Sequence, residues 1–244
     1  GAITKAGGKA VAIQADISKV EDVRRLYAET QEKLGHIDIV VNNAGILRDV
    51  MFHRMSEAEF DSVVAVHLKG SFNVSRAAAP HFKAQGSGVY VHMSSTSGLI
   101  GNFGQANYSA AKLGIAALSK SIALDMQKFG VRSNCISPFA WSRMIGSIPT
   151  ETPEEQARVE RLKQMTPAKI APLAVCLASD DAQDVTGQIF AVRNNEIFLM
   201  SQPRPLRSVQ RGEGWTPQSV AAHALPALKA SFYALDRSAD VFCW

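Results

Sequence analysis

Tyr108 and Lys112 are the two residues whose types and spacing most directly suggest chemistry. They lie four residues apart in a segment with helical periodicity, 105–129, so their side chains share one helix face. A tyrosine hydroxyl has an ordinary pKa of about 10, too high for easy proton transfer at neutral pH. A neighbouring ammonium group favours the phenolate and lowers that pKa. The spacing therefore predicts an acid–base pair, with an ordinary surface pair on a helix as the alternative.

Ser95 stands where it could act together with Tyr108. It follows an apolar run, Gly88–Met93, and a loop with three glycines leads from it to Tyr108. Glycines let the backbone turn tightly and approach a ligand closely. A serine hydroxyl at the end of a strand can hydrogen-bond a substrate oxygen held beside the tyrosine. The alternative for Ser95 is a turn or helix-capping role.

Two further groups of candidate residues follow apolar runs. Asn42-Asn43-Ala44-Gly45 follows Ile37–Val41, and its small residues would let a planar ligand approach the backbone. Its amide side chains could contact a ribose or fix the loop, and a plain turn after a strand is the alternative. Asp16 could accept a hydrogen bond from the exocyclic amine of a nucleotide, or cap the helix that begins after Ile17.

Alternating strands and helices must position these residues. The predicted strands are Lys9–Asp16, Ile37–Val41, Gly88–Met93, Val131–Ile136 and Gly187–Val192, with continuation of the last strand toward Met200 as an alternative. The predicted helices are Ser18–Leu34, Glu57–Ala84, Gln105–Phe129, Pro167–Ser179 and 216–231. This alternation indicates an α/β fold with a parallel sheet covered by helices. In such sheets, ligands bind beyond the carboxyl ends of the strands, where Asp16, 42–45, 94–98 and 137–144 are expected to lie.

Local signals set several helix ends. Ser18 with Glu21 three residues later is a capping-box pattern, and Ser56 is a second expected cap. Gly70 is expected to interrupt the second helix. Pro226 is expected to kink the last one.

Composition excludes several classes of protein. Of the 244 residues, 46% are hydrophobic and 20% charged, which argues against a disordered chain. The net charge is +4, but the basic residues are scattered, so no nucleic-acid partner is expected. No transmembrane span or signal peptide is visible, which predicts a cytoplasmic protein without a membrane partner. Of the cysteines Cys135, Cys176 and Cys243, at least the first two are expected to be buried apolar residues.

The composition changes at Ser201. The following stretch is rich in proline and arginine and lacks periodicity. We therefore expect a main domain over residues 1–200, and a linker with a C-terminal helix over 201–244. Arg204, Arg207 and Arg211 could meet the phosphates of a coenzyme, although a linker or subunit contact is the favoured interpretation.

Taken together, these motifs resemble the short-chain dehydrogenase/reductase family over about residues 1–192. The resemblance implies a Rossmann-type doubly wound sheet and hydride transfer between NAD or NADP and a carbinol or carbonyl carbon. It implies that Tyr108 is the acid–base residue and that Lys112 lowers its pKa and holds the nicotinamide ribose. It also implies that Ser95 orients the substrate oxygen. The cofactor-binding residues it implies are Asp16, Ile17, Asn43, Ala44, Gly45, Tyr108, Lys112 and Ser142.

A narrower likeness concerns the substrate. Asn42–Asp49 (NNAGILRD), His67–Phe72 (HLKGSF), Gly101–Lys112 and Ser142–Met144 resemble the (3R)-hydroxyacyl-CoA dehydrogenase region of multifunctional enzyme type 2 and its bacterial relatives. This implies a role in fatty acid metabolism. His67 stands where many family members carry an asparagine that anchors a proton-relay water. His67 is therefore a candidate catalytic residue, with a packed helix histidine as the alternative.

The front of the chain departs from the family pattern. Family members begin with a strand, a glycine-rich turn and a helix whose N-terminus binds the pyrophosphate. No such turn precedes Lys9–Asp16. In the family's strand order, two strands would lie between Lys9–Asp16 and Ile37–Val41, and their absence would leave a gap of roughly 14 Å. We therefore expect an N-terminally incomplete folding unit in which the choice between NAD and NADP cannot be read.

Three hypotheses about function follow. The leading one is an NAD(P)-dependent oxidoreductase acting on a 3-hydroxyacyl-CoA-type thioester, assembled as a homodimer or homotetramer, as the family resemblance implies. The second keeps the chemistry but changes the substrate to a 3-oxoacyl carrier protein, a steroid or a small ketone. The third is a catalytically silent structural subunit without a nucleotide loop, against which the presence of Ser95, Tyr108 and Lys112 argues.

Overall fold

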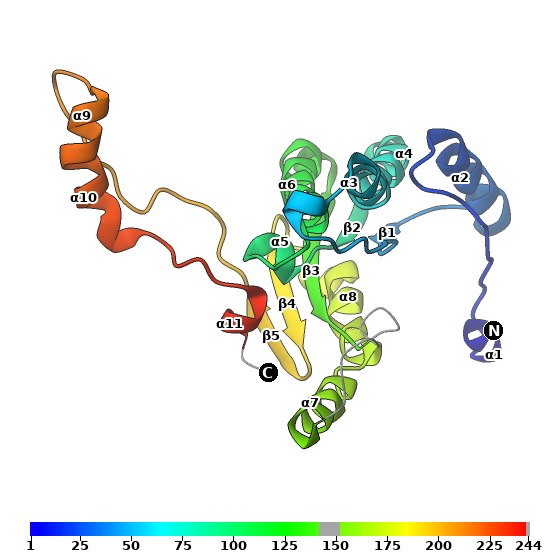
Figure 1. Ribbon diagram of the computed structural model, residues 1–244. Helices are drawn as coiled ribbons and strands as arrows, with labels where there is room; N and C mark the ends of the chain where they lie inside the picture. The colour runs from blue at the N-terminus through cyan, green and yellow to red at the C-terminus, as the bar shows by residue number, and fades with distance from the viewer. Residues whose placement is uncertain (142–151, 243–244) are drawn as a thin grey trace. The chain divides into compact units, whose positions relative to one another are not determined.

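The computed structural model, which describes residues 1–141 and 152–242, contains one five-stranded sheet among these residues (Figure 1). Its strands are β1 (Ile39–Asn42), β2 (Gly88–Met93), β3 (Val131–Phe139), β4 (Ile189–Arg193) and β5 (Glu196–Leu199). They lie in the order β1-β2-β3-β4-β5. The first four run parallel, and β5 is antiparallel to β4. The carboxyl ends of β1 to β4 therefore meet at one edge of the sheet.

Helices precede, connect and follow the strands along the chain. Those before β3 are α1 (Ala2–Lys5), α2 (Val20–Leu34), α3 (Glu57–Val64), α4 (Gly70–Gln85), α5 (Thr96–Leu99) and α6 (Ala106–Met126). A π-helical turn, Ala65–Lys69, joins α3 to α4. Those after β3 are α7 (Pro153–Lys163), α8 (Ala171–Ala178), α9 (Pro217–Ser219), α10 (Leu225–Leu228) and α11 (Ser238–Val241).

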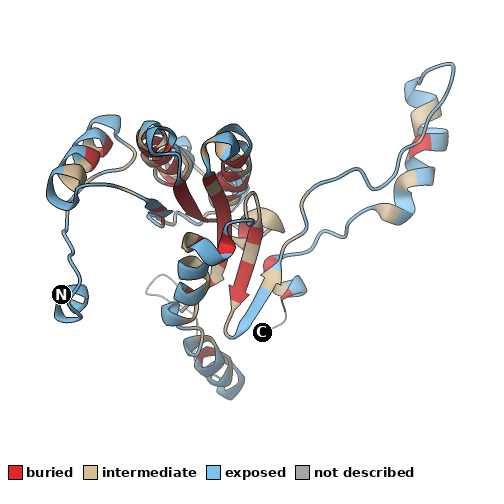
Figure 2. Ribbon diagram, turned by 180° about the vertical axis from the view of Figure 1, so that it is seen from behind, coloured by how far each residue is buried: buried red, intermediate tan, exposed pale blue. Residues whose placement is uncertain are grey.

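The core lies on both faces of the sheet. All six residues of β2 are buried, as expected for a central parallel strand (Figure 2). Val89 and Val91 on one face pack in a cluster with Leu177 of α8. Tyr90 on the other face packs in a second cluster with Phe82 of α4. The two-sided burial confirms the predicted α/β architecture.

Several predicted helix boundaries are confirmed. Ser56 caps α3 in a capping box with Glu59. Gly70 begins α4 directly after the π-helical turn, and a Cβ there would lie 2.7 Å from Cδ1 of Ile17. The expected interruption at Gly70 therefore has a packing reason, which is the close approach of Ile17 to this helix.

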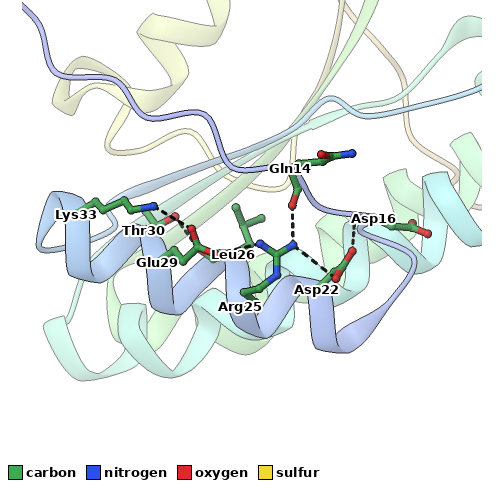
Figure 3. A network of polar contacts seen from close by, with 8 residues as sticks. All are labelled: Gln14, Asp16, Asp22, Arg25, Leu26, Glu29, Thr30 and Lys33. Atoms are coloured by element: carbon green, nitrogen blue, oxygen red, sulfur yellow. Dashed lines mark hydrogen bonds and ion pairs between the residues drawn. The ribbon is translucent and has the colours of Figure 1, made fainter.

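Lys9–Asp16 is not a strand, contrary to expectation. Its backbone groups bind side chains of α2 in place of a sheet neighbour (Figure 3). Arg25 donates to the carbonyl of Gln14 at 2.6 Å, and the amide of Asp16 donates to Asp22 at 2.8 Å. The backbone N–H and C=O groups of a strand need hydrogen bonds from a neighbouring strand. Here, side chains on the polar face of α2 provide hydrogen bonds to this backbone instead.

The edge strand β1 pairs with β2 alone among the described residues. Its outward residues Ile39 and Val41 are 47% and 48% exposed, whereas Val40 and Asn42 are buried. Apolar side chains and free backbone groups along one edge are unusual for a parallel sheet, which is normally covered on both faces.

Three further expectations are wrong. Ser18 does not cap α2, because its hydroxyl donates to Asp16 at 2.7 Å and Lys19 occupies the cap position. Cys176 is exposed on α8, although Cys135 is buried as expected. The segment beyond β4 does not continue the strand but returns as β5, through a turn in which Asn194 has φ of +53°. Asparagine tolerates this left-handed conformation.

The chain divides into two compact units. The first comprises Gly1–Met200 together with Arg237–Trp244, and the second comprises Ser201–Asp236. Within the second unit, Thr216 caps α9, and a π-helical turn, Val220–Ala224, leads into α10. Pro226 follows this π-helical turn within a continuous helical stretch, and the turn is where the regular α-helix is interrupted. No helix among residues 1–141 and 152–242 is long and apolar enough to cross a membrane.

Candidate active site

Tyr108 and Lys112 lie on the same face of α6, as their spacing predicts. The Lys112 ammonium nitrogen lies 5.5 Å from the centroid of the Tyr108 ring. It is buried and donates to the Met93 carbonyl, at the end of β2, at 2.6 Å. Burial lowers the pKa of Lys112 to about 8. Lys112 is thus protonated at pH 7 but close to its titration range.

Ser95 lies beside Tyr108 at the carboxyl end of β2. It is the N-cap of α5, and its hydroxyl accepts a hydrogen bond from the Ser97 amide at 3.2 Å. The pKa of the Tyr108 hydroxyl lies above its ordinary value, because burial raises it most, a hydrogen bond with Ser95 lowers it and the charge of Asp49 raises it; the expected lowering by Lys112 is not among these causes. The two hydroxyls are therefore close enough to hold one substrate oxygen between them.

His67 lies against Tyr108 from the π-helical turn before α4. The two rings meet edge to face, with centroids 5.1 Å apart and planes at 89°. Nε2 of His67 lies 2.7 Å from the Ile46 carbonyl oxygen and 3.0 Å from its amide nitrogen. Nδ1 is buried and has no hydrogen-bond partner among the described residues. A Cβ on Gly45 would lie 2.3 Å from Cε1 of this ring, so a glycine is required there.

Burial should make His67 sensitive to acid. Desolvation, followed by the charge of Lys112, lowers its pKa to about 4, and burial lowers the pKa of His92 in β2 to the same value. Above pH 6.5 each ring is neutral in both the folded and the unfolded chain and does not reduce the unfolding free energy. As pH falls from 6.5 toward 4, the unfolded chain takes up protons that the buried rings do not, and the unfolding free energy decreases. We expect each to cost about 2 kcal/mol of the unfolding free energy at pH 5 relative to pH 7.

Urea denaturation at these two pH values measures this loss. The variant His92→Asn should show a smaller loss than the wild type, whereas His53→Asn, at an exposed histidine, should not differ from it. An unchanged loss in His92→Asn would contradict the assignment of that part of the loss to the buried ring.

The two neighbouring asparagines at the end of β1 differ in burial. Asn42 is buried, and its amide nitrogen lies 2.9 Å from the Ser75 hydroxyl and 3.1 Å from Nδ1 of His92. Its side chain is therefore used to fix β1 against α4 and β2. Asn43, Ala44 and Gly45 are exposed, so their backbone is open to a ligand.

Asp16 and Ile17 have local partners. The carboxylate of Asp16 accepts from the hydroxyl and the amide of Ser18, which lowers its pKa, and it forms an ion pair with Lys19 at 3.6 Å. The Ile17 carbonyl accepts from Asn73 of α4 at 2.9 Å. No hydrogen bond or ion pair in the described part of the chain links Asp16 to the group around Tyr108. Ser142 lies outside the described residues.

The sequence analysis missed Asn107, which fixes the start of α6. Its side chain is fully buried and donates to the carbonyls of Arg48 at 2.9 Å and Glu59 at 3.1 Å. Its oxygen accepts from the Tyr108 amide at 2.7 Å. The signal available in the sequence was an asparagine directly before Tyr108, in the first turn of the predicted helix, where its side chain can bond nearby backbone groups. Asp49, which accepts from Gln105 at 2.8 Å, was also missed.

The chain is similar to several known proteins. It is 42% identical to peroxisomal multifunctional enzyme type 2 of Mus musculus, over 89% of this chain and 28% of that protein. It is 40% identical to hydroxyacyl-CoA dehydrogenase ChsB1 of Mycobacterium tuberculosis, over 91% of this chain and 72% of that one. A crystal structure of a short chain dehydrogenase from Mycobacterium avium matches with a TM-score of 0.81 and 35% identity, over 95% of this chain and 77% of that one.

All three relatives are longer than the matched region. This chain spans 28% of the mouse protein, 72% of the M. tuberculosis protein and 77% of the M. avium protein. A family model described as enoyl-(acyl carrier protein) reductase matches residues 1–194, which contain the four parallel strands β1 to β4. The matched region holds Ser95, Tyr108, Lys112 and the parallel strands that place them. On these grounds the chain belongs to the short-chain dehydrogenase/reductase family, with its Rossmann-type fold.

Proposed function

We propose that this chain carries the site of an NAD(P)-dependent oxidoreductase that interconverts a 3-hydroxyacyl-CoA and its 3-oxo form. The observation that carries the proposal is the placement of Ser95, Tyr108 and Lys112 around one point at the carboxyl end of β2. The substrate class is supported by relatives named hydroxyacyl-CoA dehydrogenase and peroxisomal multifunctional enzyme type 2.

The described residues fit the nicotinamide and ribose end of a dinucleotide. Asn43, Ala44 and Gly45 leave exposed backbone beside His67, where Gly45 has no room for a side chain. Lys112 places a buried ammonium near Tyr108, suited to a ribose hydroxyl. We assign the adenine end to Asp16 and Ile17, and the carboxamide to Ser142. No glycine-rich turn joins a strand to a helix within residues 1–141 and 152–242, so no pyrophosphate cradle is assigned.

The reaction needs one base and one oriented oxygen. A bound nicotinamide supplies the hydride chemistry. The Tyr108 phenolate removes the proton of the substrate hydroxyl, and Ser95 holds the oxygen in line. We propose that the Lys112 ammonium, 5.5 Å from the centroid of the Tyr108 ring, stabilises the phenolate once it forms and, with a pKa of about 8, passes a proton onward near neutral pH. We propose that His67, neutral at this pH, holds a relay water through its unpartnered Nδ1.

Titration with NADH and then NADPH tests the proposal. We expect saturable enhancement of nicotinamide fluorescence with the purified protein at its verified intact mass. Binding of neither cofactor would contradict the oxidoreductase function of this chain and favour a catalytically silent subunit. A panel of 3-hydroxyacyl thioesters, simple ketones and steroids then identifies the substrate. Turnover of simple ketones or steroids, without turnover of the thioesters, would favour a steroid or small-ketone reductase.

Assembly and location are parts of the same proposal. Phe72 of α4 and Leu113 and Leu124 of α6 are large apolar side chains left exposed by this chain. We propose that they pack in a homodimer or homotetramer, and that residues 1–200 form its catalytic domain in the cytoplasm. Light scattering would show a monomer if this assembly is wrong.

A further inference from the structure

Ser95 owes its position to a very short helix. It is the N-cap of α5, a single turn of four residues. The Ser95 carbonyl accepts from Gly98 at 3.0 Å and from Leu99 at 3.1 Å. Such a short helix has little intrinsic stability and must be held by its neighbours. The orientation of the Ser95 hydroxyl therefore depends on what packs against α5.

One side of α5 is held by α6. The Ser109 hydroxyl donates to the Ser97 carbonyl at 2.8 Å. A Cβ on Gly98 would lie 2.7 Å from the Leu113 amide nitrogen, so the two backbones are in close contact. These contacts set how far Ser95 lies from Tyr108, which is carried by the same α6.

The C-terminal segment of the first unit, Arg237–Phe242, holds both ends of α5. At the start of α5, the hydroxyls of Thr96 and Ser238 lie 2.5 Å apart, and both residues are buried. Beyond its end, the Ser238 amide donates to the Gly101 carbonyl at 2.8 Å. Ser238 thus spans the whole turn that begins at Ser95, although 142 residues separate it from Thr96.

The segment is itself anchored on the sheet. Phe242 is buried, with its ring centroid 5.0 Å from Phe139 at the end of β3 and 5.2 Å from Phe198 of β5. The Arg237 guanidinium binds both carboxylate oxygens of Asp240, at 2.6 and 2.9 Å, which closes the turn of α11. A rigid anchor on β3 and β5 lets Ser238 restrain α5.

We propose that Arg237–Phe242 is a positioning segment for the active site, with Ser238 and Thr96 holding α5 so that Ser95 faces Tyr108. Ser238 is distant in sequence from the proposed reacting residues, and its hydrogen bonds to Thr96 and Gly101 are the contacts through which it acts. The inference deepens the proposed function, because its effect on catalysis rests on the role given to Ser95. Its structural part stands on the described contacts alone.

A double-mutant cycle tests the inference. Thr96→Val and Ser238→Ala each remove one partner of the hydroxyl pair and nearly preserve shape, Thr96→Ser keeps the pair, and Ser208→Ala is an exposed control. Hydrogen exchange of the amides of Gly98, Leu99 and Ile100 should become about tenfold faster in Thr96→Val and Ser238→Ala. These amides should exchange no faster in the double variant than in either single variant, because both changes break the same contact.

Turnover provides the second readout. In Thr96→Val and Ser238→Ala we expect kcat to fall about tenfold, with the Kd for NADH unchanged and with activity retained in Thr96→Ser. Unchanged exchange, or additive effects in the double variant, would overturn the positioning role. Altered exchange with unchanged kcat would also overturn it. If the wild type shows no turnover, the proposed function fails while the exchange comparison still decides whether Ser238 holds α5.

Discussion

Tyr108→Phe should lower kcat by about 10³-fold while leaving the Kd for NADH nearly unchanged. The change removes the hydroxyl that we propose takes the substrate proton. It keeps the aromatic ring that lies 5.1 Å from His67 and 5.5 Å from the Lys112 nitrogen, so the packing of the site is preserved. Steady-state turnover of the best thioester and fluorescence titration with NADH measure the two quantities separately.

The matched control for this variant is Tyr233→Phe, which removes a phenol from an exposed tyrosine in the second unit. It should leave both kcat and Kd at their wild-type values. Turnover within threefold of the wild type in Tyr108→Phe would rule out Tyr108 as the acid–base residue. A parallel loss of cofactor binding would instead show that the hydroxyl serves mainly to bind NADH.

The sequence predicted the elements whose signals are local. The apolar run of β2 and the helical spacing of α6 are both observed, and Ser56 caps α3 through a residue only three positions away. Two local rules predicted that Ser95, Tyr108 and Lys112 would lie close together: the end of a parallel strand faces the ligand edge, and residues four apart share a helix face. Their roles came from the family resemblance.

Features that depend on distant partners could not be predicted in this way. Lys9–Asp16 has the composition of a strand, but Arg25 and Asp22 of α2 bind its backbone where a sheet neighbour would be needed. The contact of Ser238 with Thr96 is equally invisible in the sequence, because nothing near either residue specifies the other. Burial of Asn107 also follows from tertiary packing, since two of its partners belong to the loop and helix before β2.

Lys112→Met should lower kcat about 10²-fold at pH 7 through loss of the ammonium that we propose stabilises the Tyr108 phenolate. The wild-type pKa of about 8 means that Lys112 itself loses its proton as pH rises through that value. The ratio of wild-type to variant kcat should therefore shrink between pH 7 and pH 9.5. A ratio that stays constant over this range would contradict the electrostatic role and leave a purely steric one.

The same substitution should change the pH dependence of stability. The pKa of Lys112 is about 8 in the folded chain against an ordinary value of 10.5, so the unfolded chain binds more protons between these values. The unfolding free energy of the wild type should therefore rise by up to about 3 kcal/mol from pH 7.5 to pH 10.5 through this residue. Lys112→Met should lack that rise, whereas Lys120→Met on the same helix should keep it. Because stability is measured without substrate or cofactor, an equal rise in all three proteins would show that the buried ammonium is not destabilised by its site. The proton relay proposed for Lys112 would then have no thermodynamic basis.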